Sequence, residues 1–146
     1  MFGKKHTLEI LFWHEDDQKN LWILIGRAKE KPDEGKWTLF GSPQKGRCFS
    51  LGTKQIFLEQ QNTAQVLAEE LLGFAVRKNK LVRMGTNSLL YANSIYSMKL
   101  HAMLLPRHAR FHMFMWSRID MLPPTISPSL KKAVKAIEQA DIREIS

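Results

Sequence analysis

Two neighbouring carboxylates, Glu69 and Glu70, lie in a segment whose apolar residues recur with the spacing of a helix. Successive helix residues are rotated by about 100°, so one side of the segment is apolar and the other carries the acids. The apolar side contains Ala64, Leu67, Ala68 and Leu71. Carboxylate oxygens suit hard cations such as Mg²⁺, which could bridge phosphate oxygens and activate water. Adjacent glutamates on a helix are, however, most often only a solvated surface.

A second group of residues lies upstream of this acidic pair. The apolar stretch 37–40 (WTLF) runs into Gly41, and Lys45, Gly46 and Arg47 follow. A strand that ends in a glycine turn, followed by a helix with paired carboxylates, is a way to hold a divalent metal against a diphosphate.

The lead-in to these groups resembles the Nudix family, whose signature usually follows a Trp-x-Leu-Pro-Gly segment. Trp37 to Gly41 matches that segment except that Phe40 replaces the proline. Ser42 stands where the signature has its own glycine, and Gly46 resembles the turn glycine. The acidic position that follows in the signature is filled here by Arg47 or Cys48.

The helical part of the signature is similar but incomplete. Gln65 replaces its arginine, Val66 replaces its first glutamate, and Glu69 and Glu70 match its glutamate pair. Gly73 is one residue late, so either the helix is one residue longer or the register slips and Glu70 becomes the first glutamate of the pair. We prefer the longer helix, because it keeps both carboxylates on the open face. The interval before the helix is also longer than in the signature, which a loop insertion tolerates at low cost.

The resemblance implies an α/β/α sandwich with a mixed β-sheet, in the α/β class. It also implies hydrolysis of a nucleoside diphosphate derivative with Mg²⁺ or Mn²⁺. Glu69 and Glu70 would be the catalytic and metal-binding residues, and Gly41, Lys45 and Arg47 would meet the substrate. Because Val66 and Arg47 replace acidic residues, we expect weak or lost hydrolysis, with phosphate binding retained through Arg47 and Lys45. The alternative is a catalytically inactive Nudix-fold module that binds a nucleotide, RNA or a protein partner.

Other side chains could take part in such a site. Glu59 and Glu34 are candidate substitute ligands for the missing carboxylate. The segment 101–112 contains His101, His108 and His112, which could bind phosphate or act as bases, or could belong to a solvated hairpin.

The elements that position these residues follow from apolar patterning. We predict strands at 7–14, 21–27, 37–40 and 80–83, further strands within 88–105 with a break, and one at 111–119. The segment 42–61 shows no clear periodicity and is interpreted as a connector. A helix is predicted over 62–72, with Asn62 as N-cap and Gly73 at C′, and a final helix begins at 127–129. The strand 21–27 is apolar on both faces and should be central in its sheet.

Bulk properties agree with a single domain over residues 1–146. The chain has a net charge of +8 and a pI of about 9.8, which favours anionic partners. Its one cysteine, Cys48, excludes an internal disulfide. No signal peptide is apparent, and the apolar run 21–25 is too short to cross a bilayer, so we expect a cytoplasmic protein without membrane contact.

Overall fold

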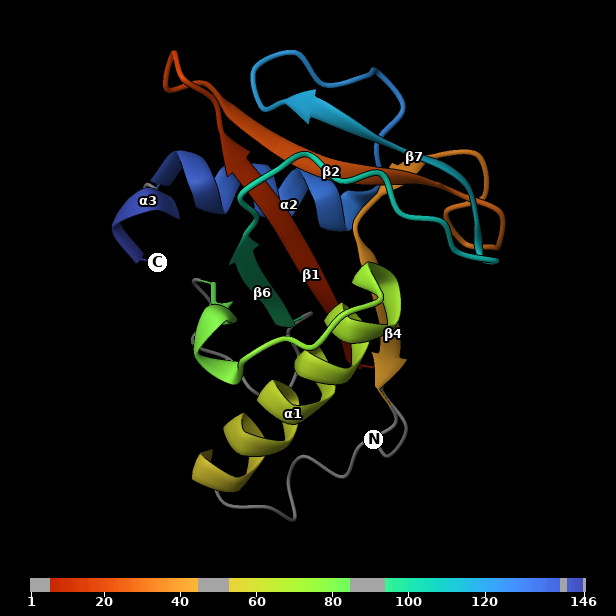
Figure 1. Ribbon diagram of the computed structural model, residues 1–146. Helices are drawn as coiled ribbons and strands as arrows, with labels where there is room; N and C mark the ends of the chain where they lie inside the picture. The colour runs from red at the N-terminus through yellow and green to blue at the C-terminus, as the bar shows by residue number, and fades with distance from the viewer. Residues whose placement is uncertain (1–5, 45–52, 85–93, 140–141, 146) are drawn as a thin grey trace.

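The computed structural model describes residues 6–44, 53–84, 94–139 and 142–145. Within these ranges a mixed sheet of seven strands is combined with helices (Figure 1). The strands are β1 (His6–Glu15), β2 (Leu21–Ala28), β3 (Trp37–Thr38), β4 (Phe40–Gln44), β5 (Val82–Arg83), β6 (Ser94–Lys99) and β7 (Phe111–Arg118). The helices are α1 (Thr53–Leu72), α2 (Pro128–Gln139), the short α3 (Ile142–Ile145) and a 3₁₀ turn, η2 (Lys78–Lys80).

Strand β1 is the centre of the sheet. One of its edges pairs in parallel with β6, while the other edge is shared by β4 at its beginning and β2 at its end, both antiparallel. Strand β2 also pairs with β3 and β7, so its predicted central place is confirmed. Among the described residues, strand β5 pairs with Tyr96 and Ser97 of β6.

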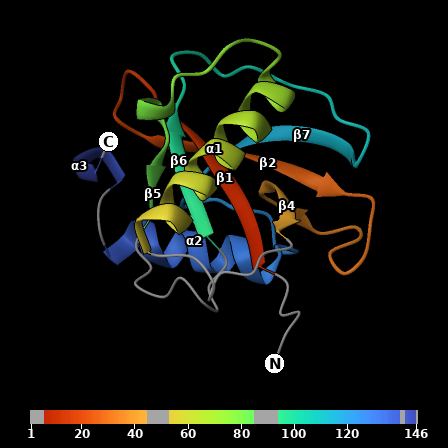
Figure 2. The ribbon, with the colours of Figure 1, turned by 90° about the horizontal axis from the view of Figure 1, so that it is seen from below.

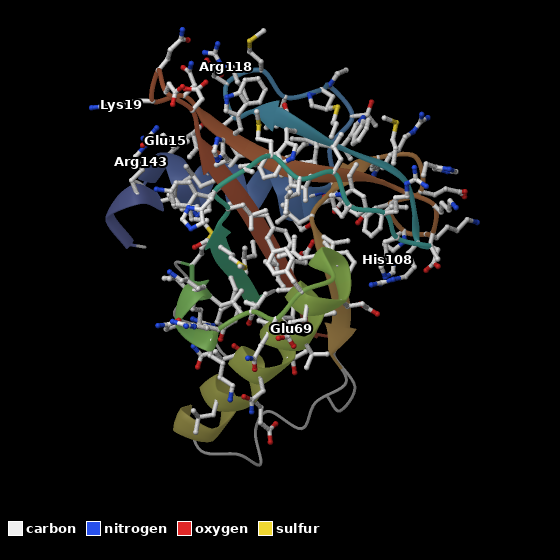
Figure 3. The ribbon with its side chains drawn as sticks, in the orientation of Figure 1. Glu15, Lys19, Glu69, His108, Arg118 and Arg143 are labelled. Atoms are coloured by element: carbon white, nitrogen blue, oxygen red, sulfur yellow. The ribbon has the colours of Figure 1, made fainter. Side chains whose placement is uncertain are left out.

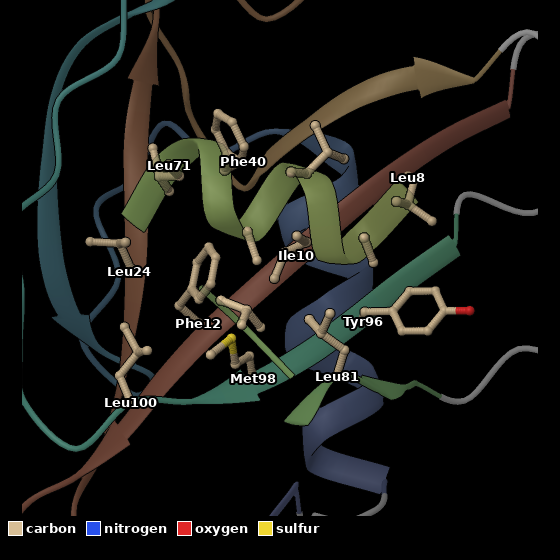
Figure 4. Packing of buried hydrophobic residues seen from close by; sticks show 14 of the residues in the cluster. Leu8, Ile10, Phe12, Leu24, Phe40, Leu71, Leu81, Tyr96, Met98 and Leu100 are labelled. Carbon is tan, nitrogen blue, oxygen red and sulfur yellow. The ribbon is translucent and has the colours of Figure 1, made fainter. Parts of the chain in front are cut away.

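The alternation of side chains along β1 places one helix on each face of the sheet. Leu8, Ile10 and Phe12 are buried against α1 (Figure 4), whereas Leu11 and Trp13 are buried with the apolar residues of α2. Figure 2 shows α1 and α2 on opposite sides of β1 and β6. The predicted α/β/α sandwich with a mixed sheet is therefore confirmed.

Helix α1 begins nine residues earlier than expected, at Thr53 rather than near Asn62. The prediction of Asn62 as N-cap was wrong, since this residue lies in the middle of α1, on its exposed side. Lysine, glutamine, glutamate and leucine, all good helix formers, dominate residues 53–61, the part of the predicted connector that is helical. The C-terminal prediction is confirmed: Gly73 has a φ of 79°, and its N–H donates to the Glu69 carbonyl oxygen at 2.9 Å.

Several strand predictions require smaller corrections. In place of the predicted strand 80–83, the structure has the end of η2 at Lys80 and the two-residue strand β5. The strand that was expected to end at Gly41 continues as β4 to Gln44. The strands 7–14, 21–27 and 111–119 correspond closely to β1, β2 and β7. The predicted strand region 88–105 contains β6, while residues 88–93 lie outside the described residues.

The final helix begins as its sequence predicts. Ser127 caps it, because its Oγ accepts the Leu130 N–H at 3.2 Å, and Pro128 occupies the first helical position. The segment before the helix is hydrogen-bonded to β3 through the backbone. The Trp37 N–H donates to the Thr125 carbonyl oxygen, and the Ser127 N–H donates to the Trp37 carbonyl oxygen. This pairing places the beginning of α2 against the chain just before Gly41.

None of the described helices has the length and apolar character that crossing a membrane requires.

Candidate functional site

Side chains along one side of α1 hydrogen-bond to the segment 73–78, which follows the helix. Gln61, Gln65 and Glu69 are spaced by four residues and therefore lie on the same side of the helix. The Gln65 amide donates to the Val76 carbonyl at 2.7 Å, and the Glu69 carboxylate accepts the Val76 N–H at 2.8 Å. The Gln61 amide donates to the Lys78 carbonyl at 3.1 Å. Glu69 therefore stabilises the segment 73–78 against α1.

The neighbouring Glu70 has a different partner. Its carboxylate lies 3.7 Å from Nε2 of His108, in the segment that precedes β7. The Glu70 side chain is 53% exposed, whereas that of His108 is only 15% exposed. The imidazole packs edge-on against Phe40, with ring centroids 5.0 Å apart, and the Arg110 guanidinium lies 5.5 Å from the centroid of the same Phe40 ring. His108 thus joins α1, β4 and the approach to β7 (Figure 3).

The predicted open face of α1 is therefore divided between two partners. Gln65 and Glu69 contact Val76, Glu70 faces His108, and Val66 is 64% exposed. Within the described residues no three His, Cys, Asp or Glu side chains form a group that could hold a metal ion. With Glu69 bound to the Val76 N–H and Glu70 facing His108, the described donors do not fit a centre of several carboxylates for Mg²⁺ or Mn²⁺.

The suggested substitute ligand Glu59 lies within α1, not in a loop. Ten residues of helix separate it from Glu69, a rise of about 15 Å, so the two carboxylates cannot share one ion. The other suggestion, Glu34, lies in the connection between β2 and β3.

Gly41 lies inside β4, directly opposite Glu9 of β1. A Cβ atom at this position would be 2.3 Å from the Leu8 carbonyl oxygen and 2.6 Å from Cγ of Glu9. The glycine is required by the close approach of two strands. Its predicted substrate contact stays a prediction, and Lys45 and Arg47 lie outside the described residues.

The segment 105–114 encloses an open hollow of about 610 Å³ beside His108. Its lining includes the basic residues Arg107, His108 and His112, together with Phe111 and Phe114, whose rings belong to the core and are only 8% and 7% exposed. Small-molecule sites usually have volumes of roughly 300–1,000 Å³. The hollow therefore combines suitable size with groups that can bind phosphate and pack against a base.

One buried acid was not recognised from the sequence. Glu9 is 7% exposed and accepts a hydrogen bond of 2.9 Å from the Ser129 hydroxyl near the beginning of α2. Ser129 also lies 3.1 Å from the Ser127 hydroxyl, which in turn donates to Thr38. Burial raises the pKa of Glu9 to about 7, with a smaller raising effect from Asp33, although the Ser129 hydrogen bond acts in the opposite direction.

No protein-family model matches the chain, and no curated protein matches it in sequence. Solved structures do match over nearly the whole chain. A mutT/nudix family protein from Listeria innocua has a TM-score of 0.65 at 10% identity, with 99% of this chain and 98% of that chain covered. The NUDIX domain of Shewanella oneidensis NrtR, solved with ADP ribose, has a TM-score of 0.63 at 10% identity, with coverages of 95% and 89%.

A third match is the C-terminal domain of mouse MUTYH, solved in complex with human PCNA. Its TM-score is 0.63 at 13% identity, and the match covers 94% of this chain and 89% of that chain. At these identities the similarity concerns the fold alone. The chain is a Nudix-fold protein.

Proposed function

We propose that this chain is a binding module for a nucleotide or a related organic phosphate, with the ligand seated in the hollow of residues 105–114. The observation that carries the proposal is the presence of Arg107, His108 and His112 around one hollow that also presents aromatic rings. Guanidinium and imidazole groups donate hydrogen bonds to phosphate, and the small exposed parts of Phe111 and Phe114 offer an apolar contact for a base.

Two further observations support this proposal. The Nudix-fold domain of NrtR was solved with ADP ribose, which makes that compound a reasonable first probe. The net charge of +8 favours the association of anions with the protein.

The test is isothermal titration calorimetry with ADP-ribose. We expect Arg107→Gln to weaken binding by about tenfold, because it removes a charge-assisted hydrogen bond. Lys132→Gln, which removes the same charge from an exposed position of α2, should leave the affinity nearly unchanged. Equal affinities of the wild type and the Arg107 variant, or no measurable binding, would overturn the proposal.

The second candidate function is divalent-metal-dependent hydrolysis of a nucleoside diphosphate derivative. It is favoured by the place of Glu69 and Glu70 in the last two turns of α1, with Glu70 about half exposed. In this candidate Glu69 and Glu70 would have to exchange their present partners, Val76 and His108, for Mg²⁺ or Mn²⁺, while Gly41, Lys45 and Arg47 would meet the substrate.

Hydrolysis can be separated from binding by ³¹P NMR of the nucleotide incubated with protein and Mg²⁺ or Mn²⁺. Metal-dependent release of a nucleotide or phosphate that Glu70→Gln abolishes would support the second candidate. Binding without turnover by the wild type would support the first.

A further inference from the structure

A second hollow, of about 640 Å³, lies at the opposite edge of the sheet from β3. Strand β5 stops pairing at Ser97, but β6 continues to Lys99, so the last residues of β6 extend beyond their neighbour. The segment 74–80 and the chain after β6 enclose this edge. Phe74, Val76, Met98 and Leu104 give the hollow an apolar lining.

The charges around this hollow have one sign. Three cations line it: Arg77 just before η2, Lys80 at the end of η2, and Lys99 at the end of β6. Of the described residues that line the hollow, none is acidic. A ligand with an anionic group and an apolar body suits this hollow, because its anionic group can contact the cations while its apolar body contacts the apolar side chains.

Trp13 provides an independent indication of a ligand. This residue lines the hollow, and Lys99 Nζ lies 5.3 Å from the centroid of the indole ring. Trp13 is 1% exposed, and its buried indole N–H finds no acceptor among the residues that the structure describes. A buried donor without a partner is costly, and polar side chains in cores normally avoid this state. A ligand acceptor that reached this N–H would remove that cost.

From these observations we infer that the hollow between the segment 74–80 and the end of β6 is a second ligand site, which takes a small organic anion with an aromatic or other apolar body. Lys80 and Lys99 attract its anionic group, and the apolar lining contacts its body. This site shares no lining residue with the hollow of residues 105–114. The two sites can therefore be tested separately.

The test uses the dye 1-anilinonaphthalene-8-sulfonate, which has an aromatic body and a sulfonate, and its uncharged relative N-phenyl-1-naphthylamine. In fluorescence titrations of the folded protein, we expect the double variant Lys80→Gln/Lys99→Gln to bind the sulfonate about tenfold more weakly. Its affinity for the uncharged dye should stay nearly the same. The control Lys131→Gln/Lys132→Gln removes two exposed charges from α2 and should change neither affinity.

A second readout locates the dye. In ¹H–¹⁵N NMR spectra we expect saturation with the sulfonate dye to shift the indole N–H signal of Trp13, assigned with Trp13→Phe. The indole N–H of Trp22 donates to Asp16 at 3.0 Å and should keep its position. The proposal is overturned if the sulfonate does not bind, if both double variants bind it equally, or if Arg107→Gln is the change that weakens it.

Discussion

Glu69 and Glu70 are adjacent in the chain, yet one holds the backbone of Val76 and the other faces a partly buried imidazole. This difference follows from the rotation of about 100° between successive helix residues, which directs neighbours toward different surroundings. The Nudix-like pattern of the sequence groups the two acids. Their contacts give Glu69 a structural task that the pattern alone does not reveal.

We expect Glu69→Ala to lower the free energy of unfolding by about 1–2 kcal/mol, because the Val76 N–H loses its charged acceptor. Glu70→Ala should change it by no more than about 0.5 kcal/mol, since Glu70 is half exposed and its partner is 3.7 Å away. Urea denaturation of both variants measures the difference. Equal losses would contradict the structural role of Glu69.

Glu9 should make stability fall as the pH rises. Its pKa increases from the ordinary 4.5 to about 7 on folding, mainly through burial. Between these values the folded protein keeps a proton that the unfolded chain has released, so stability decreases through this window and is lowest above it. We expect Glu9→Gln to remove this slope and to stabilise the protein at pH 8 by at most about 3 kcal/mol.

The measurement is the free energy of unfolding at pH 4.5 and pH 8 for the wild type, Glu9→Gln and the exposed control Glu70→Gln. Parallel pH dependences of the wild type and Glu9→Gln would show that Glu9 does not carry the effect.

The burial of Glu9 was missed although its own segment contains a hint of it. A glutamate in a strand is normally interpreted as facing water, but Leu11 and Trp13, which lie on the same side of this strand, are apolar. Its face of β1 is covered by α2, and Ser129, 120 positions away near the beginning of α2, hydrogen-bonds to the carboxylate. Such distant partners decide the environment of a side chain, and a local pattern does not contain them.

At the scale of elements, β4 lies against β1 at a position where only glycine fits. We expect Gly41→Ala to lower the free energy of unfolding by about 1–3 kcal/mol, because the new methyl group would meet the Leu8 backbone and Glu9. A fall in melting temperature, with unchanged hydrolysis or binding per folded molecule, would give Gly41 a packing role alone. A variant as stable as the wild type would contradict the close approach.

The elements were predicted best where their patterns are strong. The apolar runs of β1, β2 and β7 and the caps Gly73 and Ser127 have local physical causes, so the sequence contains them. The beginning of α1 was missed because the first half of this helix lacks a clear apolar stripe, although its residues favour helix. The division of the acidic face between Val76 and His108 depends on chain segments that return from elsewhere, which helix periodicity does not determine.

For the whole molecule, the positive charge predicts a dependence of polyanion binding on salt. Because its net charge is +8, the protein should bind single-stranded RNA weakly at low salt, where phosphate contacts release bound counterions. We expect the logarithm of the affinity to fall linearly with the logarithm of salt concentration, with a slope of about −0.7 for each phosphate contacted. Fluorescence anisotropy of a labelled oligonucleotide at several salt concentrations measures this slope. Tight binding that salt does not affect would contradict a charge-based contact.

The most direct test of the proposed binding module is a ¹H–¹⁵N NMR titration of the whole protein with ADP-ribose. We expect the largest shifts at the backbone amides of Arg107, His108, His112 and Phe114, which line the hollow beside Glu70. The amides of α2, on the opposite face of the sheet, should remain unchanged. Saturable binding whose shifts avoid residues 105–114, or the absence of any shift at millimolar ligand, would contradict the assignment of this hollow as the phosphate-binding site.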